Sequence, residues 1–234
     1  MLYVYALAET SEAALPARRG HRGAPLRHLS RDGVTAVFSR HREIELPPEE
    51  RHLWRHERVT EALMADRGVL PVRFGTTVDD EAALATMLSE RADEFRALLD
   101  LVRGRVEIGV RALWTPPAEE PPADVPAARD TADVAGPVGP GRAYLLDALR
   151  TRHAGARLAD ALHAALAEQA VSARRRVLAT PRLLLSGAYL VDRDGVDRFL
   201  AAADEIDGAH GDVELVCTGP WPPHSFAAGS AEGR

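Results

Sequence analysis

The sequence predicts an α+β protein built of two units, and three observations support that prediction. Stretches with strand character alternate with stretches of helical periodicity along the chain. A proline-rich segment, residues 115–141, has no periodicity and separates two such stretches, as a linker or a long loop would. The length of 234 residues and the hydrophobic content of 46% fit one large or two ordinary packed domains.

The first unit is expected to begin with a strand at residues 2–8, where apolar side chains alternate weakly. A hairpin follows, in which residues 25–30 and 34–39 flank Arg31-Asp32-Gly33. Asp-Gly between two apolar runs is a turn signal, because glycine tolerates a positive φ. Two prolines and two glutamates at residues 47–50 then mark the start of the first helix.

The rest of the first unit is predicted to be strand, helix and strand. Residues 69–74 are apolar except for Arg73 and form a strand, and the acidic residues 79–81 open a helix that Gly104 ends. Residues 106–114 form the last strand. The order β, β-β hairpin, α, β, α, β predicts an N-terminal ferredoxin-like sheet over residues 1–114, with an extra strand and both helices on one face.

The second unit, residues 142–234, is predicted to be an α+β domain that begins with a long helix rich in alanine and leucine. This helix is expected to run from Arg142 to about Val177, and its apolar stripe is narrow enough to favour one partner helix. Five leucines form the stripe: Leu145, Leu149, Leu158, Leu162 and Leu166. A strand at 183–191, a helix at 196–206 and a strand at 213–217 complete the unit.

The last strand runs into a rigid aromatic segment, residues 219–226. Three of its residues are prolines, which fix φ and lack an N–H group, so the segment is expected to leave the sheet. Burial of Trp221 and Phe226 would contribute roughly 1.5–3 kcal/mol each, which predicts a structural clasp or a docking surface. A similar pattern occurs earlier, where a strand ends at Trp114 and Pro116-Pro117 follow. This repeated strand, tryptophan and proline pattern suggests that the two units are related.

Composition excludes several classes of protein. The formal net charge of −6, with no segment basic overall, argues against nonspecific electrostatic binding of nucleic acid. The chain has no lysine, which excludes Schiff-base chemistry and a P-loop lysine. Its one cysteine, Cys217, allows no intrachain disulfide or cysteine zinc cage. The first residues resemble a strand and not a signal peptide, so a cytoplasmic protein is expected.

No motif for catalysis, a metal or a cofactor stands out. His52 and His56 have metal-capable spacing but lack the glutamate of a metalloprotease motif. Gly136 to Arg142 is rich in glycine, but its prolines remove N–H groups that a phosphate cradle would use. His224-Ser225 has no Gly-x-Ser-x-Gly context. Arg73 is interpreted as solvated or as one member of a structural ion pair.

Five segments, in this order, resemble the gas vesicle protein F/L family. They are residues 69–76, residues 106–114, residues 141–145, the run around Tyr189 (188–191) and the closing residues 219–226. The opening Tyr3-Val4-Tyr5 also fits this resemblance, which covers nearly the whole chain. The family's usual closing pattern has tyrosine where this chain has His224.

The resemblance implies a gas vesicle accessory or minor structural protein with no enzymatic activity and no cofactor. The implied partners are the hydrophobic major shell-forming protein (GvpA-type) and other gas vesicle accessory proteins, with neither nucleic acid nor lipid membrane. Residues expected to serve structure or interaction are Arg73, Phe74, Trp114, Tyr189, Trp221 and Phe226. The alternative is a small-molecule or nucleotide-binding enzyme on a ferredoxin-like scaffold, because fold does not fix function.

Overall fold

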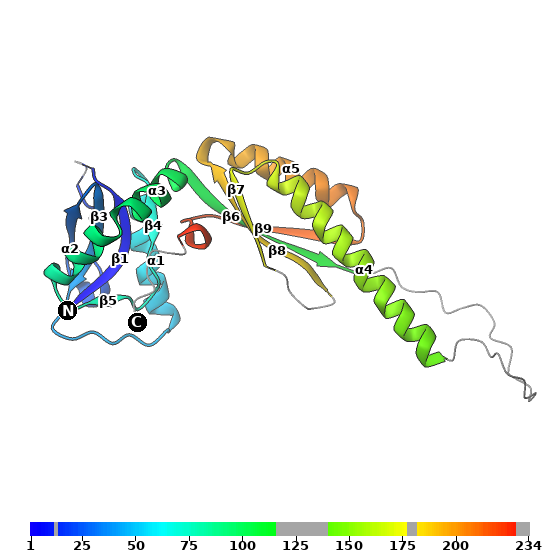
Figure 1. Cartoon of the computed structure of the whole chain (residues 1–234), viewed down its shortest axis with the longest axis horizontal. Helices are drawn as coiled ribbons and strands as arrows, with labels where there is room; N and C mark the ends of the chain where they lie inside the picture. Colours follow the sequence, from blue (N-terminus) through cyan, green and yellow to red (C-terminus); the bar gives the residue numbers. More distant parts are fainter. Residues whose placement is uncertain (12–13, 116–139, 177–181, 228–234) are drawn as a thin grey trace, which may run out of the picture.

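The computed structural model describes residues 1–11, 14–115, 140–176 and 182–227, so most of the expected linker lies outside the described residues. The molecule is elongated, with the first antiparallel sheet at one end, the second nearer the middle, and a long helix that extends toward the other end (Figure 1). The first sheet has five strands and the second has four, and helices cover both. The predicted α+β class is therefore confirmed.

The first sheet is built around the opening strand β1 (Leu2–Glu9). The order is β2 (Leu26–Arg31), β3 (Val34–Arg40), β1 and β4 (Val69–Pro71), with β5 (Thr77–Val78) also paired to β1. The predicted hairpin between β2 and β3 is present, and Asp32 and Gly33 have φ values of 47° and 83°. The conformational freedom of glycine makes this turn possible.

Helices lie on both faces of the first sheet, so the prediction of helices on one face is wrong. Helix α1 (Glu50–Met64) packs on the face that carries Tyr3 and Tyr5. Helices α2 (Glu81–Glu90) and α3 (Ala92–Val102) cover the face that carries Leu2, Val4 and Leu7. Strand β1 is apolar at nearly every position because both of its faces are buried.

The second sheet begins with β6 (Arg105–Trp114) and ends with β9 (Val213–Trp221). Between them come α4 (Pro140–Ala167), β7 (Ser172–Arg176), β8 (Leu183–Asp192), the short turn η2 (Arg193–Gly195) and α5 (Val196–Ala209). The strands lie in the order β7-β8-β6-β9, and each neighbouring pair is antiparallel. A β-α-β-β-α-β chain in this order has ferredoxin-like connectivity.

The ferredoxin-like arrangement therefore lies in the second sheet and not in residues 1–114. Strand β6, predicted as the last strand of the first unit, is a central strand of the second sheet. Its own sequence does not distinguish the two positions, because an alternating strand fits either sheet. The boundary between the sheets falls between α3 and β6, so the described residues up to 104 form the N-terminal unit and those from 105 to 227 form the C-terminal unit.

Several elements differ from their predicted bounds: the strand predicted at residues 69–74 ends at Pro71, and the helix predicted at residues 196–206 continues to Ala209. The helix predicted from residue 79 to 104 is divided at Arg91, whose φ and ψ of −116° and 19° interrupt it. The long helix ends at Ala167, and Arg174 and Arg175 lie in edge strand β7, where backbone pairing with β8 replaces helical hydrogen bonds. Strand β9 continues past Cys217 to Trp221, because a register shift in its pairing with β6 accommodates the proline.

Candidate functional site

The closing segment, residues 222–227, connects the two units. It leaves β9 and forms the short turn η3 (His224–Phe226), which packs against β4 of the first sheet. Phe226 is fully buried, as its sequence context predicts, in an apolar cluster that joins the first sheet and helices α2 and α3 to Leu190 of β8. The guanidinium carbon of Arg174, from the second sheet, lies 5.3 Å from the centre of the Phe226 ring. Figure 1 shows η3 between the two sheets.

Two carboxylates, one from β6 and one from α1, bind this segment. The backbone N–H and the hydroxyl of Ser225 both donate to Glu107 of β6, at 2.7 Å each. Nε2 of His224 lies 2.9 Å and 3.0 Å from the two carboxylate oxygens of Glu57 on α1. Burial lowers the pKa of His224, but the hydrogen bond and charge of Glu57 outweigh this effect, so its pKa is raised overall. The segment therefore binds β6 and α1 at once.

Replacing the hydroxyl in this contact is expected to destabilise the protein. Glu107 is only 9% exposed, so its carboxylate cannot recover the lost bond fully from water. We expect Ser225→Ala to lower the free energy of unfolding by about 1–3 kcal/mol, as measured by urea denaturation. Ser89→Ala, at an exposed helix position, is the matched control and is expected to change it by less than about 0.5 kcal/mol. Equal stability of the two variants would contradict the assigned role of Glu107.

Trp114 and Tyr189 belong to a different place, the core beneath α4 and α5. Nε1 of Trp114 donates to Asp212 at 2.9 Å. The Tyr189 hydroxyl lies 2.9 Å from Nδ1 of His163, and burial raises the pKa of Tyr189. Both residues are almost fully buried, so neither presents a surface to a partner in this conformation.

Trp221 is half-buried and lies opposite Glu107, whereas Trp114 lies opposite Val213 at the other end of the same strand pair. The two tryptophans therefore occupy neighbouring strands of one sheet. The suggested relation between the two units is wrong, because a repeat would place the tryptophans at equivalent positions of separate sheets.

The remaining two candidates lie in the N-terminal unit and do not join the others. Phe74 is half-buried and packs edge-on against Tyr3 and His56, with ring centres 6.3 Å and 5.9 Å apart. Arg73 is exposed, and among the described residues it has no ion-pair partner. Thus the six candidate residues are spread over three regions, and only Trp221 and Phe226 lie near the junction of the units.

A buried polar cluster under α1 was not anticipated. Nε2 of His56 donates to the Val72 carbonyl at 2.9 Å, and its Nδ1 lies 3.1 Å from the Tyr3 hydroxyl. The Tyr5 hydroxyl accepts from the backbone N–H of His21 at 2.7 Å and bonds Ser39 at 2.8 Å. Both His56 nitrogens are therefore engaged within the fold. The repeated tyrosines at positions 3 and 5 were the available signal, since alternation places them on one face.

No part of the described chain gathers the groups that a metal site or a membrane span requires. Among these residues no three His, Cys, Asp or Glu side chains are placed to hold a metal ion. Within the same residues no helix combines the length and hydrophobicity that crossing a bilayer requires.

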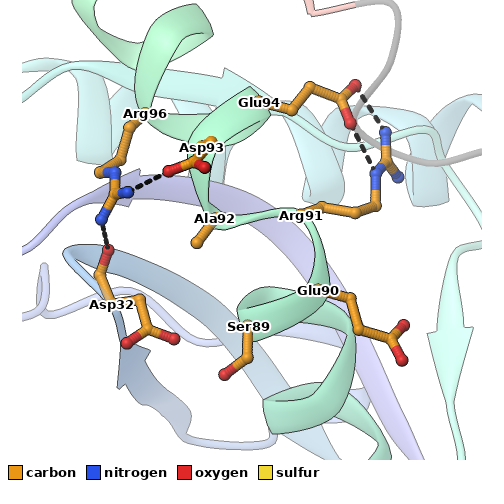
Figure 2. A pocket seen from close by; sticks show the side chains of 8 residues that line it. All are labelled: Asp32, Ser89, Glu90, Arg91, Ala92, Asp93, Glu94 and Arg96. Carbon is orange, nitrogen blue, oxygen red and sulfur yellow. Dashed lines mark hydrogen bonds and ion pairs between the residues drawn. The ribbon is translucent and has the colours of Figure 1, made fainter.

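A cleft of about 510 Å³ lies at the break between α2 and α3 (Figure 2). Its charges largely satisfy one another: Arg91 makes two bonds of 2.8 Å to Glu94, and Arg96 bonds both Asp93 and the Asp32 carbonyl. Paired charges at an open surface leave little binding energy for a ligand. We therefore interpret this cleft as a structural feature, a break between two helices that ion pairs and hydrogen bonds stabilise.

The geometry defines a class of protein: two antiparallel sheets with covering helices, the second ferredoxin-like, joined by a buried aromatic segment. Comparison with known proteins identifies the class more closely. The chain belongs to the gas vesicle synthesis protein GvpL/GvpF family, whose model matches residues 1–228.

Relatives within this family are similar over most of their length. Gas vesicle protein F of Streptomyces sp. (strain CB03234) is 32% identical, over 96% of this chain and 98% of that protein. Gas vesicle protein L of the same strain is 33% identical, over 74% of this chain and 67% of that protein.

Crystal structures of GvpF show the same fold. The protein from Anabaena sp. PCC7120 aligns with a TM-score of 0.77 at 20% identity, covering 97% of this chain and 95% of that one. The protein from Microcystis aeruginosa aligns with a TM-score of 0.75 at 17% identity, covering 97% and 98%.

Proposed function

We propose that this chain is a non-enzymatic assembly factor and minor component of gas vesicles that binds the hydrophobic shell-forming protein in the cytoplasm. The observation that carries the proposal is its membership of the GvpL/GvpF family over residues 1–228. The buried histidine, tyrosine and glutamate side chains form hydrogen bonds within the fold. This agrees with a role that depends on protein–protein contacts.

Helix α4 offers the surface best suited to an apolar partner. Leu162 and Leu166 are buried against the second sheet, but Leu145 and Leu149 are 62% and 50% exposed. Because an α-helix turns about 100° per residue, these two leucines point roughly a quarter turn away from the buried face. They are therefore available to a second helix or to a groove, and an apolar subunit awaiting assembly would gain from covering them.

A charge on this surface is expected to weaken the complex. We expect Leu145→Glu combined with Leu149→Glu to reduce co-purification of the shell-forming protein at least ~10-fold, because the contact would bury two carboxylates. The matched control is Ala161→Glu combined with Ala164→Glu, which adds the same charge at exposed positions of the same helix. The control is expected to retain the partner.

Two results would overturn these proposals at different levels. If the wild-type protein captures no shell-forming subunit and deletion of its gene leaves vesicles intact, the assembly function is wrong. If the wild-type protein captures the subunit and the leucine variant does so equally well, the function stands and the surface is elsewhere.

A further inference from the structure

Four arginines from two separate segments line one small cleft in the N-terminal unit. Arg18 and Arg19 come from the segment that precedes η1 (His21–Gly23), and Arg55 and Arg58 come from α1. The cleft has a volume of about 210 Å³, and its other lining residues are Ala17 and Val59. No carboxylate lines it.

The positive charge of this cleft has no internal counterpart in the described part of the chain. None of the four guanidinium groups forms an ion pair there, and Arg19 makes only a 3.5 Å contact with the Gly23 carbonyl. By contrast Arg51, one turn earlier on α1, pairs with Glu49 at 2.8 Å. What distinguishes the cleft is that four such unpaired arginines line one hollow whose lining contains no carboxylate.

Buried contacts fix the backbone that brings these like charges together. The segment is tied to the core where the His21 N–H donates to the Tyr5 hydroxyl, at 2.7 Å. Gly20 lies so close that a Cβ there would be 2.3 Å from the same hydroxyl oxygen. On the opposite wall, His56 and Val59 are buried and hold α1 in place. The fold thus fixes the backbone positions of four exposed arginines around one cleft, and an anion there would meet positive charge from both walls.

We propose that this arginine cleft binds a short acidic segment of a partner protein. Guanidinium groups form paired, planar hydrogen bonds with carboxylates, and several of them along one cleft suit successive Asp or Glu side chains. Pockets for whole small molecules usually exceed about 300 Å³, so this cleft is too small to enclose a nucleotide. The acidic balance of the whole chain disfavours a long nucleic acid.

The inference goes beyond the proposed function, because the cleft lies in the N-terminal unit and the exposed leucines lie on α4. It identifies a second, electrostatic contact, and its binding would weaken with added salt, whereas burial of leucine would not. The two surfaces can therefore be tested separately.

The test is fluorescence anisotropy of a labelled octapeptide of alternating Asp and Glu, titrated with the full chain at low and high salt. The expected result is salt-sensitive binding that an Asn/Gln peptide of equal length does not show. Arg55→Gln combined with Arg58→Gln is expected to weaken binding at least ~10-fold, because two charge-assisted contacts are lost. The matched control is Arg27→Gln combined with Arg31→Gln, exposed on β2 at positions paired with Phe38 and Val34.

The control pair is expected to keep the affinity within about twofold, since it removes equal charge from the other face of the sheet. If both double variants lost the same amount of affinity, the effect would come from net charge alone, and the proposal would be overturned. Binding of the neutral peptide, or binding of inorganic phosphate without binding of the acidic peptide, would also overturn it. Circular dichroism of each variant confirms that it is folded.

Discussion

Phe226→Ala is expected to lower the free energy of unfolding by about 3–5 kcal/mol, the range for removing a buried phenylalanine. Phe226 is fully buried, and it completes the core formed by the first sheet with α2 and α3. The cavity would lie where the closing segment packs against β4, in a core that the sheet and its helices hold in place, so little collapse of the surroundings can compensate. Urea denaturation followed by circular dichroism measures the change.

Val171→Ala is a suitable control, because Val171 is 45% exposed and its truncation leaves no cavity. It is expected to change the free energy of unfolding by less than about 0.5 kcal/mol. A Phe226→Ala variant as stable as this control would mean that the closing segment does not hold the units together, and a docking role would become its better explanation.

Acid is expected to destabilise the protein between about pH 6.5 and pH 4, through the buried histidines under α1. Burial lowers the pKa of His21 and of His56 from 6.5 to about 4. In this pH range the two histidines are protonated in the unfolded chain but stay neutral in the native protein. The free energy of unfolding therefore falls as the pH falls. The slope is expected to approach about 1.4 kcal/mol per pH unit for each of the two histidines.

His224 does not oppose this loss. Its pKa is raised, so the stability that it contributes is fully present below its unfolded pKa of 6.5 and is lost only as the pH rises above that value. Its contribution is therefore constant within the acid window, and the two effects separate by pH.

Urea unfolding at several pH values measures the slope. His56→Gln is expected to reduce the slope by the contribution of one histidine, about 1.4 kcal/mol per pH unit. His28→Gln, at an exposed position of β2, is the control and is expected to keep the wild-type slope. A slope that is the same in the wild type and in His56→Gln would show that burial does not hold this histidine neutral.

Local signals in the sequence were sufficient for most individual elements. The Asp32-Gly33 turn, the Pro-Pro-Glu-Glu start of α1 and the apolar strands β6 and β8 all follow from short-range chemistry. The burial of Phe226 was also predictable, since a rigid aromatic segment beside a strand gains stability by packing. These features depend on residues within one turn or one strand.

Long-range assignments were not available from the same signals. Strand β6 pairs with β8 and β9 although its sequence follows the first unit directly. The five leucines of α4 were predicted to form one stripe, yet Leu145 and Leu149 point away from the face that packs on the second sheet, and they stay exposed. The arginine cleft brings together residues from two segments on different sides of the hairpin, and short-range signals do not reveal this proximity.

The place of Phe226 also has a consequence for synthesis. The core of the first sheet contains both Leu2 and Phe226, residues separated by more than 200 positions. Chains emerge from the ribosome at about 5–20 residues per second, so the N-terminal unit waits for many seconds with an open apolar site. Its final packing is therefore a step that follows translation of the C-terminal unit, and a chain that stops before residue 226 cannot complete its first core.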